Sequence, residues 1–146
     1  MALPIPELIT LDIVKTLKGI RTAAGYSFTI SDVERAKTPD NVPAAWKAIV
    51  GVGNPTEIAR TYPLITMHLN YDVGIWIQVN EASGVAPDSL PWMVWSDVCR
   101  ALMVDEHRGN NAHRTIPQVP RFGDSAVVIP VIVECRFRAD DPTLRG

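Results

Sequence analysis

The chain has 146 residues, of which 47% are hydrophobic and 21% are charged, and its formal net charge is -2. This length suits one domain with its own core, and the composition is too hydrophobic for a disordered chain. The near-neutral charge excludes a globally basic protein, so any contact with nucleic acid has to come from a local patch. The sequence therefore predicts a single domain over 1–146, with a short arm at 1–4 and a C-terminal tail at 139–146.

Apolar residues recur at helical spacing from Ile5 to Ala24, which predicts a first helix. Pro6 suits its first turn, and Gly25 suits the left-handed position after its end. Gly19 lies inside this pattern, and we expect it to bend the helix without breaking it.

Extended segments and loops alternate in the next part of the chain. Alternating residues predict strands at 27–33 and 46–52, separated by a polar, proline-containing loop at 36–42. Residues 56–61 are expected to form a surface connection. Strict alternation then predicts strands at 65–71 and 75–79, and the tight segment between them indicates a hairpin.

A second helix is expected from Ser89 to about Asp105, with Pro91 in its first turn. A last strand pair follows at 112–119 and 125–138, in which Pro130 favours an edge position or a bulge. Together these elements predict an α+β fold, a mainly antiparallel sheet with two helices packed on one face and extended loops between strands. The expected inward face of the last strand is Val127, Ile129, Val131, Val133, Cys135 and Phe137.

Neither membrane insertion nor export is indicated by the sequence. Its longest apolar run, 126–133, is far shorter than the roughly 20 residues that span a bilayer. The N-terminus lacks the pattern of a signal peptide. Cys99 and Cys135 lie outside any C-x-x-C spacing, which favours inert thiols in a reducing cytoplasm.

No residue pattern indicates catalysis, and we expect no catalytic, cofactor-binding or metal-binding residue. Motifs for phosphate loops, nucleophile elbows and zinc proteases are absent from the sequence. The adjacent Asp105 and Glu106 are expected at a solvated helix end. The three histidines are not grouped with other ligands at metal-binding spacing, and they are His68, His107 and His113.

Two residue sets leave alternatives open. Several bulky side chains either anchor the core or mark subunit contacts, namely Trp46, Ile49, Trp76, Trp92, Trp95 and Ile132. The arginines of the last third form either a solvated face or a lining that faces DNA, and they are Arg108, Arg114, Arg121, Arg136 and Arg138.

The order of these elements resembles the tail terminator, or tail completion, proteins of long-tailed phages, over about 5–137. The chain departs from that family in its long 36–61 region and its cluster of tryptophans. The resemblance rests on five segments of the chain. The first helix ends in small residues and an aromatic at 22–26 (TAAGY), and the strand after it ends at 33–35 (VER). A proline-led strand follows at 62–67 (YPLITM), a later helix ends in an acidic segment at 101–105 (ALMVD), and a Gly-Asn loop comes at 109–110.

This resemblance implies a virion protein, assembled in the host cytoplasm, that forms a ring, typically a hexamer. The ring caps the tail tube, stops its polymerisation and joins the connector of the head, while DNA passes through its lumen without sequence specificity. We expect contact loops at 36–41 and 54–61. The candidate contacts with other copies, the tube protein and the connector are Lys37, Thr38, Pro39, Asp40, Asn54, Thr56, Glu57, Trp76 and Trp92, and the candidate DNA-facing residues are Arg108, Arg114, Arg136 and Arg138.

Three other functions remain open at this point. A head-closure adaptor or a minor tail-tube protein would share the structural role. A small hydrolase or nuclease would require Asp105, His107 and His113 to converge in a pocket. The last alternative is an interaction module of a cellular host.

Overall fold

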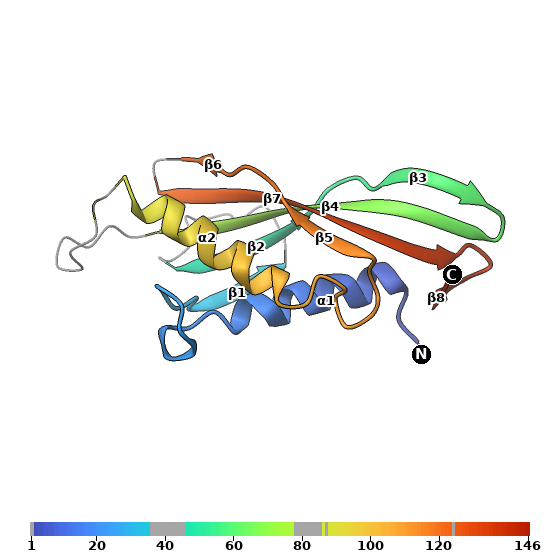
Figure 1. Cartoon of the computed structure of the whole chain (residues 1–146), viewed down its shortest axis with the longest axis horizontal. Coiled ribbons are helices and arrows are strands. Elements are labelled where there is room, and N and C mark those ends of the chain that lie inside the picture. Colours follow the sequence, from blue (N-terminus) through green and yellow to red (C-terminus); the bar gives the residue numbers. More distant parts are fainter. Residues whose placement is uncertain (1, 36–45, 78–85, 87, 124) are drawn as a thin grey trace.

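The computed structural model describes residues 2–35, 46–77, 86, 88–123 and 125–146. Within them the chain forms two α-helices, one short 3-10 helix and a single, mostly antiparallel sheet (Figure 1). The predicted α+β class is confirmed. In chain order the elements are α1 (Ile5–Lys18), η1 (Thr22–Ala24), β1 (Asp32–Arg35), β2 (Lys47–Val52), β3 (Thr56–Thr61), β4 (Leu64–Trp76), α2 (Leu90–Met103), β5 (Arg114–Pro117), β6 (Arg121–Phe122), β7 (Ala126–Arg138) and β8 (Asp141–Arg145).

Two long strands, β4 and β7, form the centre of the sheet. Each has 13 residues, and they pair along their whole length in antiparallel register. β2 and β3 pair one after the other with the edge of β4 that faces away from β7. β5, β6 and β8 pair with the edge of β7 that faces away from β4. β1 completes the sheet beside β2 as a parallel strand. The far end of the β3–β4 hairpin extends beyond α1, so the domain is elongated (Figure 1).

A single core joins the two helices to the sheet. Alternate residues of β4 and β7 point inward, from Leu69 to Ile75 and from Val127 to Cys135. The buried sides of α1 and α2 belong to the same cluster. The period-two pattern of the strands and the helical spacing of the apolar residues therefore converge on one core.

Helix α1 is shorter than the sequence predicts. Its buried face begins at Ile5 as expected, but the helix ends at Lys18 and Gly19 is its C-cap. The expectation of a bend without a break at Gly19 is wrong, because glycine costs about 1 kcal/mol relative to alanine and no further helical residues compensate. Gly25 does adopt the expected left-handed conformation, with φ 92°, after the separate 3-10 turn η1.

The second helix agrees with its prediction. Ser89 is the N-cap residue of α2 and Pro91 lies in its first turn. Its buried side chains are Val94, Asp97, Val98, Ala101 and Leu102.

The predicted hairpin at 65–79 is wrong, because β4 continues straight through 72–74. Tyr71, Val73 and Ile75 keep an unbroken inward alternation, and Asp72 faces outward where it pairs with Arg121. The sheet register on both sides of β4 therefore overrides the local turn signal.

Other boundaries also differ from the predictions. The strand expected at 27–33 instead begins at Asp32 and forms β1 (Asp32–Arg35). The residues before it hydrogen-bond outside the sheet, since the amide of Ile30 donates to the carbonyl of Ile20 (3.0 Å). The expected connection at 56–61 is β3, and much of the expected tail is β8. The loop expected at 36–42 lies outside the described residues.

Pro130 does not lie on an edge strand, since β7 is central. Its carbonyl accepts the amide of Gln118 (2.8 Å) just after β5 ends, and its Cα partner in β4 is Asp72. β6 pairs with β7 only beyond this point, through Arg121 and Phe122. The missing N–H of proline is therefore tolerated where one neighbouring strand has ended and the next has not begun.

Candidate interaction surfaces

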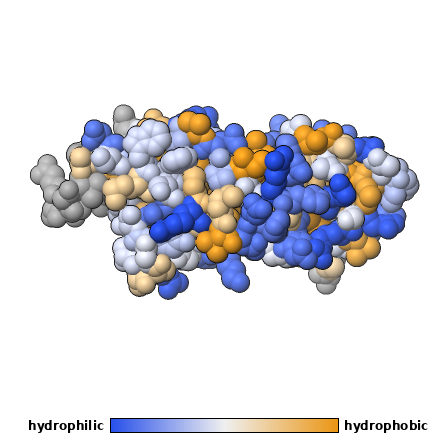
Figure 2. All heavy atoms as spheres, viewed as in Figure 1, coloured by the Kyte–Doolittle hydropathy of each residue, from blue (hydrophilic) through white to orange (hydrophobic). Residues whose placement is uncertain are grey.

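Three of the four candidate DNA-facing arginines lie at outward-facing positions of the sheet. Arg114 is the cross-strand partner of Glu134, and Arg136 and Arg138 are partners of outward residues of β4. Figure 2 shows one side of the domain, where hydrophobic residues occur in separate groups among polar ones along its length.

Acidic partners neutralise part of this face. Glu134 accepts from His68 (Nε2 to Oε2, 3.0 Å) and forms an ion pair with Arg114 (3.4 Å). These contacts, chiefly the hydrogen bond with His68, lower the pKa of the Glu134 carboxyl. Arg138 forms an ion pair with Asp140 at 2.8 Å. The face is therefore of mixed charge and is not a continuous positive collar.

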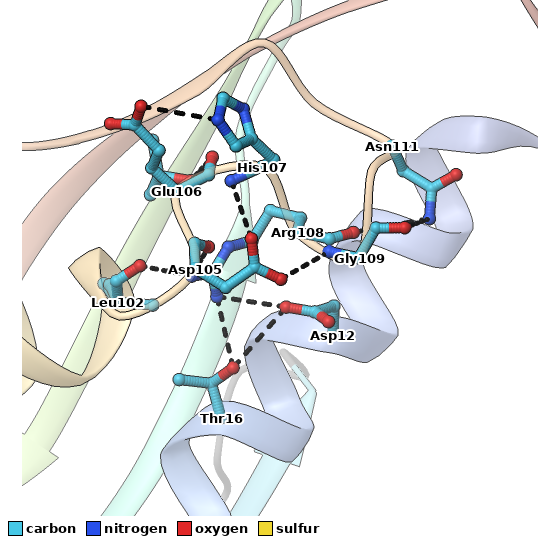
Figure 3. A network of polar contacts seen from close by, with 10 residues as sticks. Asp12, Thr16, Leu102, Asp105, Glu106, His107, Arg108, Gly109 and Asn111 are labelled. Carbon is cyan, nitrogen blue, oxygen red and sulfur yellow. Dashed lines mark hydrogen bonds and ion pairs between the residues drawn. The ribbon is translucent and has the colours of Figure 1, made fainter.

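Arg108 does not face DNA or solvent, which corrects its prediction. The side chain is fully buried (0% exposed) beneath the turn that follows α2 (Figure 3). Its guanidinium pairs with Asp12 of α1 (3.0 Å) and donates to the Thr16 hydroxyl (3.1 Å). It also donates to the carbonyl oxygens of Leu102 and Asp105. An arginine with this many internal acceptors stabilises the packing of α1 on the turn and is unavailable to a ligand.

The turn around Arg108 is held by a second carboxylate. Asp105 accepts the backbone amides of Gly109 (2.8 Å) and His107 (3.1 Å), and the first of these contacts is the main cause of its lowered pKa. Arg108, Gly109 and Asn110 have φ of 49°, 66° and 71°. Three consecutive left-handed residues are uncommon, and the hydrogen bonds of Asp105 and Arg108 compensate for their conformational cost.

The candidate contacts at 54–57 lie in β3 and in the residues just before it, and not in the loop that the sequence predicts. Asn54, Thr56 and Glu57 are all exposed. Asn70 donates to the Asn54 carbonyl (2.8 Å) and to the Thr56 hydroxyl (3.3 Å), while Glu57 pairs with Arg60. The other predicted contacts in this class, Lys37, Thr38, Pro39 and Asp40, lie outside the described residues.

Two groups of exposed apolar residues lie on elements at opposite ends of the domain, one on α2 and β6 and the other on the β3–β4 hairpin (Figure 1). The first, called the aromatic patch, consists of Trp92, Trp95 and Phe122, with Trp92 51% and Phe122 44% exposed. The Trp92 ring contacts those of Phe122 (4.9 Å) and Trp95 (5.8 Å) edge to face. The second, called the arm tip, consists of Tyr62 (75% exposed) at the turn between β3 and β4 and Ile58 (49% exposed) within β3.

The other bulky candidates are more enclosed than Trp92. Trp46 stacks on Phe28 with ring centroids 5.1 Å apart, and Trp76 is half-buried over Gly74. Ile49 is buried and Ile132 is half-buried. Sequence patterns missed Phe122 and Tyr62, because a two-residue strand and a turn are too short to show a period, and missed Ile58, because all six residues of β3 are exposed.

The three residues that the hydrolase or nuclease alternative requires do not converge. Within the described part of the chain, the side chains of Asp105, His107 and His113 make no hydrogen bond to one another, and His107 instead lies 3.6 Å from Glu106. No metal-binding group of three or more histidine, cysteine or acidic residues occurs among the described residues. Burial raises the pKa of the Cys135 thiol to about 11, so this thiol is protonated at neutral pH.

No protein-family model and no curated protein sequence matches this chain. In the described residues, neither helix is long and apolar enough to cross a membrane. The fold and the surfaces define an elongated α+β domain that exposes different apolar groups at its two ends.

Proposed function

We propose that this chain is a structural virion subunit that assembles head to tail into a ring, and that this ring caps the tail tube of a long-tailed phage. In this role it ends tube polymerisation, joins the tail to the connector of the head and lets DNA pass through its lumen. The phage role comes from the resemblance in the order of elements. The self-assembly comes from the surfaces of the domain.

The observation that supports self-assembly is the separation of the aromatic patch from the arm tip. Identical subunits that use two different patches at opposite ends associate heterologously, and such contacts close into a ring or continue as a filament. Aromatic residues are enriched in subunit interfaces, and Trp92 leaves about half of its surface available. A two-fold dimer would need only one of these patches.

Variants that block one end each test this arrangement. Trp92→Ala with Phe122→Ala removes the aromatic patch, and Ile58→Ala with Tyr62→Ala removes the arm tip. Each double variant alone should be monomeric by light scattering coupled to size-exclusion chromatography, while the wild-type chain forms a larger ring. Mixing the two double variants should restore one intact contact and yield a 1:1 dimer and nothing larger.

The matched control is Leu11→Ala, an exposed apolar position (42%) on α1 outside both patches, which should leave the ring unchanged. A monomeric wild-type chain, or rings formed by either double variant, would contradict the proposal. Negative-stain electron microscopy separates the structural alternatives, because a terminator stops at one ring and a tube protein forms long stacks. Six subunits in each ring would agree with the hexamer that the resemblance implies.

A further inference from the structure

An open groove of about 330 Å³ lies beside the aromatic patch, between α2 and Ser27. Its lining residues are Ser27, Ser89, Trp92, Met93, Ser96 and Asp97. All but Ser27 belong to α2 and its N-cap, at positions three or four apart, which share one face of a helix. The volume is at the lower end of the range for ligand sites, about 300–1,000 Å³, so it suits one inserted side chain better than a whole segment.

Asp97 supplies the polar end of this groove, and one of its oxygens has no hydrogen bond. The side chain is only 8% exposed, and its Oδ2 accepts the amide of Ser27 (2.7 Å). Its Oδ1 lies 3.6 Å from Nη2 of Arg100, which is too long for a hydrogen bond, and accepts no hydrogen bond from the described residues. Because buried polar atoms are nearly always paired, this oxygen favours a donor that comes from outside the chain.

The other wall of the groove is apolar. Trp92 and Met93 form it, and the edge-to-face contacts with Trp95 and Phe122 hold the Trp92 ring in place. An apolar wall with a carboxylate at one end matches a side chain that has an apolar body and a hydrogen-bond donor at its tip. Tyrosine and tryptophan are the aromatic side chains of this kind.

The arm tip presents such a side chain. Tyr62 is the most exposed of the phenylalanine, tyrosine and tryptophan residues, at 75%, and its hydroxyl makes no hydrogen bond to the described residues. The turn that carries it is fixed, since Thr61 pairs with Leu64 and the amide of Ala139 donates to the Pro63 carbonyl (2.6 Å). The turn and α2 lie at opposite ends of the domain (Figure 1), so a chain cannot fill its own groove.

We propose that the Tyr62 side chain of a neighbouring copy enters this groove, with its ring against Trp92 and Met93 and its hydroxyl donating to the Asp97 carboxylate. The inference rests on the proposed head-to-tail assembly, and it names the side chain and the acceptor of that contact. Both partners are held in place within their own chains, so little conformational entropy is lost when they meet.

The 1:1 dimer of the two double variants isolates this contact. In it Tyr62 comes from the Trp92→Ala, Phe122→Ala chain and the groove from the Ile58→Ala, Tyr62→Ala chain, and isothermal titration calorimetry gives the Kd. Tyr62→Phe removes only the hydroxyl and should raise the Kd about tenfold to a hundredfold, the loss expected for one hydrogen bond to a charged group. In a groove chain that carries Asp97→Ala, Tyr62→Phe should change the Kd less than about twofold, because the acceptor is already gone.

The matched control is Glu34→Gln in the groove chain, an exposed carboxylate paired with Lys47 away from the groove, which should leave the Kd unchanged. Asp97→Asn, which keeps an acceptor for the Ser27 amide, replaces Asp97→Ala in the cycle if circular dichroism shows that the alanine variant is unfolded. Failure of the two chains to form a dimer would overturn the proposed assembly and this inference with it. A dimer that forms but is insensitive to Tyr62→Phe, or equally sensitive with and without Asp97, would leave the assembly standing and overturn the contact between Tyr62 and Asp97.

Discussion

Replacing Arg108 with methionine tests whether the buried guanidinium stabilises the packing of α1 on the turn after α2. Methionine keeps much of the side-chain length, so the change removes polar contacts without leaving a large void. It leaves the Asp12 carboxylate, the Thr16 hydroxyl and the carbonyls of Leu102 and Asp105 without their donor.

The magnitude follows from the burial of the two charged partners. Removing one member of a fully buried ion pair costs about 3–5 kcal/mol. The Arg108 side chain is 0% exposed but that of Asp12 is 27% exposed, so water can partly hydrate the orphaned carboxylate. We therefore expect a loss of about 3 kcal/mol in the free energy of unfolding. For a domain of this size the loss corresponds to a fall in Tm of about 6–12 °C.

Urea denaturation followed by circular dichroism measures this loss. An m-value equal in wild type and Arg108→Met would show that the two proteins expose similar surface on unfolding. Asp12→Asn supplies the other arm of a double-mutant cycle. It should destabilise the wild type by about 1 kcal/mol and have almost no effect in the Arg108→Met background. A loss below about 1 kcal/mol for Arg108→Met would refute the assignment of a stabilising buried network.

Three further predictions concern the pH dependence and the core. The pKa of Tyr71 is raised to about 12 by burial, so the unfolded chain ionises first and the wild type should lose stability between pH 10 and 12 faster than Tyr71→Phe, as measured by urea midpoints. The pKa of Glu134 is lowered by His68, so Glu134→Gln should be less stable than wild type at neutral pH, and this gap should close as the pH falls below the unfolded pKa of about 4.3. A gap that persists in acid would contradict the assigned hydrogen bond. Ile13→Ala should cost about 2–5 kcal/mol because the side chain is fully buried, whereas the exposed Leu11→Ala should stay within about 0.5 kcal/mol.

The period of apolar residues predicted the parts of this fold in which one face is buried along a whole element. The inward alternation of β7 from Val127 to Cys135 was predicted correctly, since burial on one side of a strand imposes a period of 2. The predicted turn at 72–74 failed because both turn-forming residues point away from the core face of β4, where Asp72 is exposed and Gly74 is covered by the Trp76 ring. β3 was missed for a related reason, since all its residues are exposed and show no period.

The candidate sites were predicted less well than the fold, because their chemistry depends on contacts between distant segments. Arg108 sits in a polar loop sequence that is typical of surface arginines, and its partner Asp12 lies almost 100 residues earlier on α1. Arg145 likewise reaches the Asn110 carbonyl only because β8 returns along the edge of β7. Neither spacing in the sequence nor charge composition carries information on such pairings.

The length of β4 and β7 links the proposed assembly to the core. Both strands pass from the region covered by the helices to the arm tip without interruption, and their full antiparallel pairing makes this extension rigid. The position of Tyr62 is therefore fixed relative to the core that supports Trp92. A flexible arm would lose conformational entropy at each subunit contact, whereas a paired strand has already lost it on folding. The two apolar patches can then suffice for a closed ring, because each subunit makes two contacts and its geometry is fixed before assembly.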